Sequence, residues 1–220
     1  MHDTSDALVN AKLGVTMSDD SVWAEGTLKA ESGAVFSNLG LLVFYEIFKF
    51  LEEALERHKD SLIGDLLIPG MARTIALESD LAHYLGEEWQ KDYVIREEVS
   101  DYLKHLNKLE ESDPYLLCPY VYHLYMGLFS GGQVLKAKRM LSLSSIAGLK
   151  EDDDGGEKPG YSVTNYGDVP IGSLKRQLKK AMNELAENLD EETREQMLVQ
   201  SAKVFEMNNV IIGSVKGVDR

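Results

Sequence analysis

The sequence predicts an all-α protein folded as one domain. Apolar residues recur every three or four positions along most of the chain, which is the spacing of one face of a helix. No segment shows the strict alternation of apolar and polar residues that marks a half-buried strand, and no internal repeat is found. A chain of 220 residues is long enough to bury one large core. We therefore expect residues 1–220 to form a single helical domain.

The first three expected helices are defined by this spacing. Residues 41–59 place apolar side chains such as Phe44 and Phe48 on one side and charged residues on the other. Residues 70–85 follow the same pattern and stop at Gly86, a residue type favoured just beyond a helix C-terminus. A third helix is expected around 99–109, where apolar residues again recur at three and four.

The remaining helices are identified by their capping residues. Asp113 followed by Pro114 is typical of a helix start, so we expect a fourth helix over 114–142, the least polar segment of the chain. A fifth is expected over 173–187, and a sixth over 191–209 with Asp190 as its N-cap. The segment between the fourth and fifth helices, 150–167, is rich in Asp, Gly and Pro, so we expect a flexible, solvated loop.

Composition excludes several classes of function. The chain carries 37 acidic and 23 basic residues, a net charge of −14, so nucleic acid is not an expected partner. Its single cysteine, Cys118, excludes an internal disulfide and a zinc site built from several cysteines, and it favours a reducing compartment. No apolar run is long enough to cross a bilayer, and no signal peptide is recognised. We expect a cytoplasmic protein.

The expected fourth helix contains three glycines, Gly127, Gly131 and Gly132. Each costs about 1 kcal/mol relative to alanine inside a helix, so some other interaction must offset them. One explanation is close packing of a neighbouring helix, or a kink of the kind that Gly and Ser produce. The other is that the helix backbone must lie flat against a large planar ligand. The residues alone leave both open.

Five segments in order resemble the heme oxygenases of the eukaryotic, biliverdin-producing type, with insects among the most similar, across about 41–215. They are FYEIFKFLEEALERHKDS (44–61), RTIALESDLAHYLGEEW (73–89), SGGQVLK (130–136), and KRQLKKAMNEL (175–185) with VFEMNN (204–209). This resemblance implies that heme b is held between a proximal helix, which gives a histidine to iron, and a glycine-rich distal helix. It also implies oxidative cleavage of heme to biliverdin, Fe²⁺ and CO, using O₂ and electrons from NADPH through a flavoprotein reductase.

The resemblance assigns the distal side of the heme to the glycine-rich helix. Gly127 and Gly131 match the two family glycines whose backbone touches the porphyrin. The family aspartate that organises water on this side is Leu128 here, and a family arginine one turn earlier is Leu124. Because leucine has no acidic group and cannot hydrogen-bond to water, we expect slow turnover or relaxed choice of the carbon that is cleaved.

The resemblance also assigns the groups around the heme edge. Lys175 and Lys179 match family positions that bind the two propionates, and Tyr122 matches a hydroxyl contact. Phe205 is expected to form part of the pocket wall. The basic residues around Lys175 are expected to serve also as a landing site for the reductase.

The resemblance implies a proximal histidine followed four residues later by an acidic residue. Counting back from the matching segments without a gap reaches Val15, which has no lone pair for iron. His2 with Asp6 has the family pattern, and it requires an insertion of about thirteen residues within 27–39. We therefore expect His2 to bind the heme iron and Asp6 to hold the other ring nitrogen. The other histidines, His58, His83, His105 and His123, are expected to have no special role.

Three functions are compared. The first is a heme oxygenase, monomeric and followed by biliverdin reductase, in the cytoplasm or on the cytosolic face of the endoplasmic reticulum if a longer form carries a tail anchor. The second, suggested by Leu128, is a non-catalytic protein that binds and buffers heme. The third, a di-iron carboxylate bundle, needs paired Glu-x-x-His motifs, and the chain offers only Asp80-x-x-His83. We favour the first.

Overall fold

The computed structural model describes residues 38–147 and 160–215, and within these residues the protein is helical and contains no strand. The predicted all-α fold is confirmed. The predicted residues His2 and Asp6, and all but the last two residues of 27–39, lie outside the described part; 38 and 39 belong to the first described helix. The elements are α3 (Asn38–Arg57), η1 (Leu62–Leu66), α4 (Thr74–Leu85), η2 (Trp89–Lys91), α5 (Glu97–Ser112), η3 (Pro114–Leu117), α6 (Cys118–Ala147), η4 (Ser162–Thr164), α7 (Ile171–Asn188) and α8 (Glu191–Val215).

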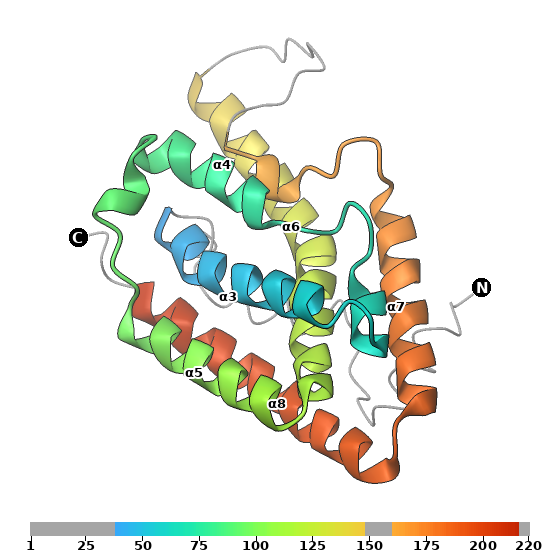
Figure 1. Ribbon diagram of the computed structural model, residues 1–220. Coiled ribbons are helices and arrows are strands. Elements are labelled where there is room, and N and C mark those ends of the chain that lie inside the picture. Colours follow the sequence, from blue (N-terminus) through green and yellow to red (C-terminus); the bar gives the residue numbers. More distant parts are fainter. Residues whose placement is uncertain (1–37, 148–159, 216–220) are drawn as a thin grey trace.

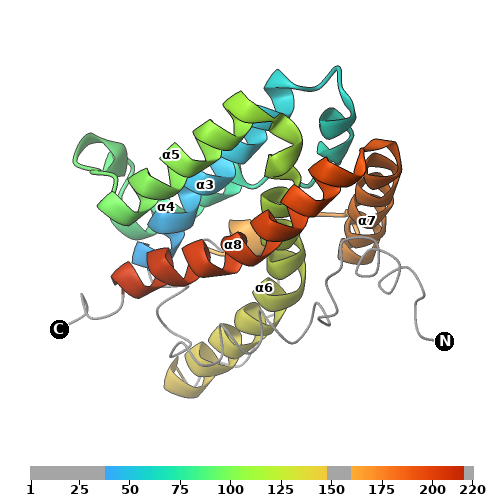
Figure 2. The same ribbon diagram turned by 90° about the horizontal axis from the view of Figure 1, so that it is seen from below.

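The helix α6 runs through the middle of the molecule and bends along its course (Figures 1 and 2). It packs against α7 and α8, while α3 packs against α4, α5 and α8. Every residue from 116 to 127 is buried, as expected for a segment that is apolar on all sides. The core therefore surrounds the first half of α6, the part that carries Gly127.

The capping predictions are largely confirmed. Gly86 has a φ of 95°, and its backbone N–H donates to the carbonyl of Ala82. Asp190 accepts a hydrogen bond of 2.7 Å from the backbone N–H of Thr193. Asp113 also caps a helix, by accepting from the N–H of Tyr115, but it opens the 3-10 helix η3, and α6 begins only at Cys118.

The second helix starts at Thr74, four residues later than predicted. The carboxylate of Glu52 on α3 accepts hydrogen bonds from the backbone N–H groups of Arg73 and Thr74 and from the Thr74 hydroxyl. A residue distant in sequence therefore caps α4. The local pattern of residues 70–85 contains no sign of this contact.

The segment predicted as a solvated loop differs from expectation where it is described. Residues 150–159 lie outside the described part, but Val163, Thr164 and Tyr166 are buried. The fully buried carboxylate of Asp80 on α4 accepts from the backbone N–H groups of Ser162, at 2.8 Å, and Val163, at 2.9 Å. This carboxylate fixes η4 to α4, so the end of the segment is part of the core.

Glu110 joins the C-terminal end of α3 to α5. Its carboxylate accepts two hydrogen bonds from the Arg57 guanidinium, at 2.9 and 2.7 Å, and its Oε1 lies 3.0 Å from Nε2 of His58. The Arg57 hydrogen bond is the largest cause of a lowered pKa of Glu110, and His58 adds to it. Because this pKa is lower in the folded than in the unfolded protein, the stabilisation is complete above the unfolded pKa. It is lost as pH falls through the folded pKa.

We therefore expect Glu110→Gln to lower the free energy of unfolding at pH 7 by about 0.5 kcal/mol, the usual size for a solvent-screened pair. The difference from wild type should shrink to zero as pH falls below the folded pKa, because the side chain at position 110 is then uncharged in both proteins. Urea denaturation between pH 3 and pH 8 measures it. The exposed neighbour provides the control, Glu111→Gln; a difference independent of pH would contradict the assignment.

Candidate functional site

The helix α6 has two contrasting sides. At 100° per residue, His123, Gly127, Ser130 and Gly131 fall within an arc of about 100°, which we call the glycine arc. Tyr125, Phe129 and Gly132 fall on the opposite side, with Leu128 next to them. The glycine arc carries glycine at two consecutive helical turns, Gly127 and Gly131, whereas the opposite side carries bulky aromatic rings.

Aromatic contacts hold the side of α6 opposite the glycine arc. The ring of Tyr125 meets Phe48 of α3 edge to face at 5.1 Å, and the ring of Phe129 lies 5.4 Å from that of Tyr166. The guanidinium carbon of Arg73 lies 4.0 Å from the centre of the Tyr166 ring. These contacts connect α6 to α3, to the start of α4 and to the segment after η4, so α6 is supported from behind.

Gly132 serves packing rather than the glycine arc. A Cβ atom at Gly132 would lie 3.2 Å from Cδ1 of Leu128 and 3.3 Å from Cγ2 of Thr164, both tighter than ordinary contacts. The close approach of η4 to α6 therefore favours a small residue at this position, because a Cβ atom would need the neighbouring side chains to shift by a few tenths of an ångström. Of the two explanations offered for the three glycines, close packing accounts for Gly132, while Gly127 and Gly131 lie on the other side of the helix.

Residues of α7 and α8 border the glycine arc. The ammonium group of Lys175 on α7 donates a hydrogen bond of 2.7 Å to the hydroxyl of Ser130. The ring of Phe205 on α8 lies 4.9 Å from the ring of His123. The arc is thus bordered by an amine near Gly131 and by an aromatic ring one turn before Gly127. This arrangement offers a flat backbone surface with a cation at its margin.

The other predicted residues are distributed around this arc. Tyr122 and Lys179 are both buried, and Phe205 is half-buried. Leu124 is buried, and Leu128 is half-buried against the position of Gly132. The described part of the chain therefore brings Gly127, Gly131, Lys175 and Phe205 together. The roles predicted for all of these residues remain predictions.

His123 is a residue whose surroundings the sequence did not reveal. It is 6% exposed, and its Nε2 has no hydrogen-bond partner within the described residues. Burial lowers the pKa of His123 to about 4, so the imidazole is neutral at pH 7. Its position four residues before Gly127, on the same side of a helix, was the available signal.

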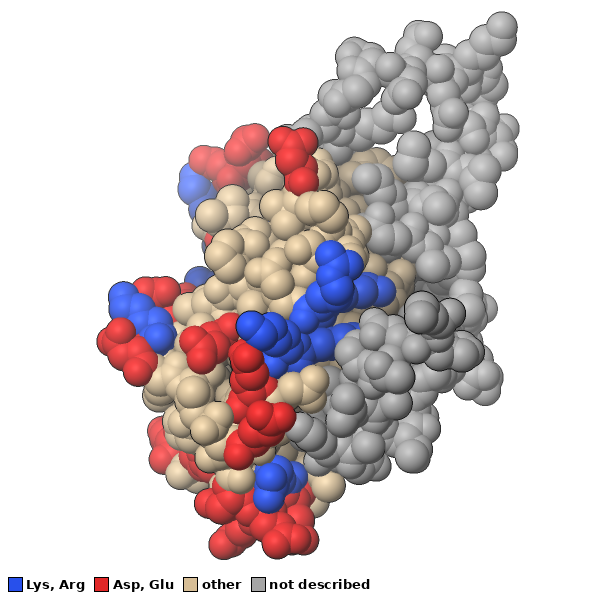
Figure 3. Space-filling view, turned by 90° about the vertical axis from the view of Figure 1, so that its right-hand side faces the viewer, with Lys and Arg blue, Asp and Glu red and all other residues tan. Residues whose placement is uncertain are grey.

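Basic side chains gather over α7 on the face of the molecule that Figure 3 shows. The helix carries four cations within six residues: Lys175, Arg176, Lys179 and Lys180. Arg176 and Lys180 are exposed, and Lys180 lies 3.5 Å from Glu184 in an exposed ion pair. In a chain of net charge −14, this helix is a local positive surface next to the glycine arc.

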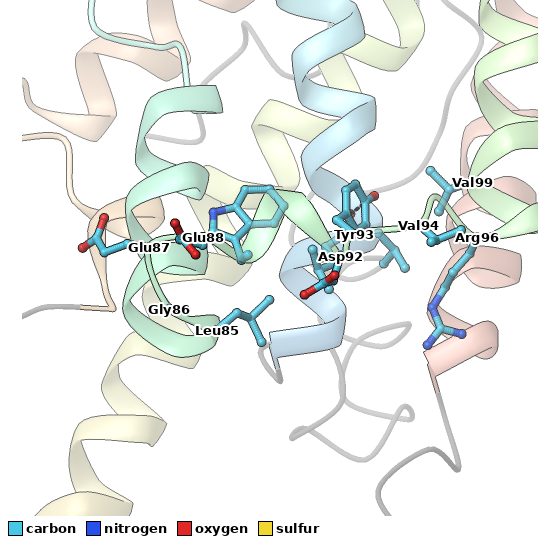
Figure 4. A pocket seen from close by; sticks show the side chains of 12 residues that line it. Leu85, Gly86, Glu87, Glu88, Asp92, Tyr93, Val94, Arg96 and Val99 are labelled. Atoms are coloured by element: carbon cyan, nitrogen blue, oxygen red, sulfur yellow. Dashed lines mark hydrogen bonds between the residues drawn. The ribbon is translucent and has the colours of Figure 1, made fainter.

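A pocket of about 680 Å³ lies elsewhere, between the first turns of α3 and the segment that joins α4 to α5 (Figure 4). Its wall combines aromatic residues such as Trp89 and Tyr93 with the charged residues Glu88, Asp92 and Arg96. None of its lining residues belongs to α6, α7 or α8. Its size alone does not make it the functional site, because none of the predicted site residues lines it.

Two other kinds of site are absent from the described residues. Among the side chains that the structure describes, in 40–132 and 160–215, no group of three or more His, Cys, Asp or Glu is placed to hold a metal ion. Within the same ranges, no helix combines the length and the apolar character needed to span a bilayer.

Comparison with known proteins identifies the family. A family model described as heme oxygenase matches residues 36–213 of this chain. Heme oxygenase 2 of Oryctolagus cuniculus is 31% identical over 196 residues, which cover 87% of this chain and 57% of that protein. Heme oxygenase 1 of Bos taurus is 28% identical over 222 residues, which cover 98% of this chain and 72% of that protein. The chain spans little more than half the length of several curated relatives that it matches.

Solved structures support the same conclusion. The crystal structure of heme oxygenase 2 from Chlamydomonas reinhardtii without heme superimposes with a TM-score of 0.69 at 28% sequence identity, covering 97% of this chain and 91% of that one. Heme oxygenase-1 from the cyanobacterium Synechocystis, in complex with heme, superimposes with a TM-score of 0.67, covering 91% of this chain and 93% of that one. Its 24% identity shows a shared fold alone.

The Asp80 contact with η4 leads to a stability prediction. We expect Asp80→Ala to lower the free energy of unfolding by about 3 kcal/mol, because the buried N–H of Val163 and the partly buried N–H of Ser162 lose their acceptor. Urea denaturation measures it. The matched control is Asp101→Ala, which removes a carboxylate that is 62% exposed and should change stability by at most about 0.5 kcal/mol. Equal effects of the two substitutions would show that Asp80 does not hold η4.

Proposed function

We propose that this chain, which belongs to the heme oxygenase family, binds heme against the glycine arc of α6 and cleaves it to biliverdin, Fe²⁺ and CO. The reaction uses O₂ and electrons that NADPH supplies through a flavoprotein reductase. The single observation that carries the proposal is the coincidence of the family match with a helix that has glycine at two consecutive turns of one side and aromatic packing on the other.

The residues around the glycine arc fit a porphyrin. Gly127 and Gly131 have no side chains, so the backbone can approach a flat ring closely. The amine of Lys175 and the buried amine of Lys179 provide positive charge for two carboxylates, and Phe205 offers an apolar wall. When bound, heme supplies the iron at which O₂ is activated, and the ring is itself the substrate. The chain's own contribution is to hold and orient the ring.

The iron ligand is proposed to be His2, supported by Asp6. The proposal rests on the family pattern in the sequence, since both residues lie outside the described part of the chain. A histidine ligand needs a second group on its other ring nitrogen to fix the tautomer, and a carboxylate one helical turn later is suited to that task.

We expect hemin-loaded protein to show an absorbance spectrum of ligated ferric iron that His2→Ala removes and that added free imidazole restores. The restoration separates a missing ligand from a damaged fold. The control is His83→Ala, because His83 is exposed on α4 and should leave the spectrum unchanged. An unaltered spectrum in His2→Ala would remove His2 from the site.

Leu128 is the observation that favours a second function, a protein that binds and buffers heme without cleaving it. Its side chain is apolar and half-buried against the Gly132 position, so it neither supplies a proton nor orders water by hydrogen bonding. Proton delivery by a placed acid commonly contributes a hundredfold or more to a rate. We therefore propose slow cleavage with relaxed choice of the meso carbon.

The two functions separate in one assay. With hemin, a flavoprotein reductase, NADPH and O₂, the enzyme loses its Soret band while biliverdin appears, whereas the buffering protein keeps its Soret band. We expect slow cleavage by the wild type and an increase of at least about tenfold in Leu128→Asp. The matched control is Leu128→Asn, of the same size but without an acid group. A wild-type rate equal to that of Leu128→Asp, with a single biliverdin isomer, would contradict this account of Leu128.

The proposed partners follow from the chemistry and from charge. The exposed cations of α7 offer a docking surface for an acidic reductase, and biliverdin reductase is proposed to take the product. We propose that the protein works as a monomer in the cytoplasm.

A further inference from the structure

His123 lies at one end of the glycine arc, next to Phe205 of α8. It precedes Gly127 by one helical turn, about 6 Å along the axis, and Gly131 by two turns. Its ring contacts Phe205 of α8 at 4.9 Å. A ring held over Gly127 and Gly131 therefore meets His123 at its periphery rather than at its centre. On this side of α6, His123 lies between Gly127 and the ring of Phe205 on α8.

The imidazole of His123 lacks a hydrogen-bond partner for one of its ring nitrogens within the described residues. The side chain is 6% exposed, and its Nε2 finds no hydrogen-bond partner within the described residues. A buried polar group without a partner destabilises a fold, and native proteins rarely keep one unless a water, ion or ligand completes it. His105 shows the contrast: its Nε2 lies 2.7 Å from the hydroxyl of Tyr120 and 3.1 Å from Oε1 of Gln200.

The chemistry of a porphyrin limits what this nitrogen can meet. The polar groups of the ring are the central metal with its nitrogens and the two carboxylates at the edge. The central metal is excluded by the position of His123 at the periphery. A neutral imidazole retains one N–H, and a carboxylate accepts from it. Burial favours the neutral form at pH 7, because it lowers the pKa of His123 to about 4.

We infer that Nε2 of His123 donates a hydrogen bond to a carboxylate of the bound porphyrin, an inference that rests on the proposed function. His123 is then a positioning residue, which helps to set how the ring turns within its plane above Gly127. This position was predicted to have no special role from the sequence, because a histidine in a helix is most often an ordinary one.

The inference predicts opposite effects of one substitution on stability and on binding. In His123→Leu, the ligand-free protein should be as stable as the wild type or more stable, because an unpartnered buried nitrogen is replaced by an apolar group. The same substitution should weaken binding of metal-free protoporphyrin IX about tenfold or more, the usual effect of losing a hydrogen bond to a charged group. Urea midpoints and quenching of porphyrin fluorescence measure the two quantities.

The dimethyl ester of protoporphyrin IX identifies the group that His123 meets. Its carboxylates are blocked, so wild type and His123→Leu should bind it with equal affinity. The matched control is His105→Leu, which removes a partnered nitrogen: it should lower the urea midpoint and leave porphyrin affinity unchanged. An undiminished affinity of His123→Leu for the metal-free acid would overturn the inference.

Hemin titration separates this inference from the function on which it rests. If wild-type protein binds no hemin, the proposed function fails. If hemin binds but His123→Leu weakens hemin alone and not the metal-free ring, the imidazole acts on iron, and the carboxylate contact is wrong. A loss with hemin and with the metal-free acid, absent with the ester, supports the contact.

Discussion

The candidate site depends on one constraint: the central helix must be held by aromatic packing on one side while two of its turns carry glycine, without a side chain, on the other. Several glycines weaken a helix, so α6 needs support from other parts of the chain. Phe48 and Tyr166 provide it by packing onto Tyr125 and Phe129 of α6. The flat backbone surface is therefore a product of tertiary contacts on the far side of the helix. A substitution in these aromatic contacts can therefore alter the glycine arc although it lies on the other side of the helix.

Charge is distributed to match this arrangement. The chain has a net charge of −14, yet α7 presents four cations next to the glycine arc. Lys175 is tied to Ser130 of α6, while Arg176 and Lys180 extend outward. A positive surface of this kind attracts anions towards one border of an otherwise acidic molecule.

The sequence predicted most of the helices because apolar spacing and capping residues are local signals. Gly86 and Asp190 act as predicted, since a cap depends on a few neighbouring residues. The start of α4 and the burial of η4 were missed because Glu52 and Asp80 act across the fold, on backbone groups distant in sequence. Gly127 and Gly132 look alike in sequence, and only the packing of Thr164 separates their roles.

Arg73 has a consequence that extends beyond its own neighbourhood. Its guanidinium donates to the carbonyl groups of Gly70, Met71, Ala72 and Asn165 while it lies over the ring of Tyr166. Two stretches of chain that lie 92 residues apart in sequence are thereby joined by one rigid planar group. A lysine could not replace Arg73, because an ammonium group has fewer donors and no planar surface to stack on the Tyr166 ring. The segment that leads into α4 and the segment that follows η4 are therefore held together by one side chain, so a displacement of either one is passed directly to the other.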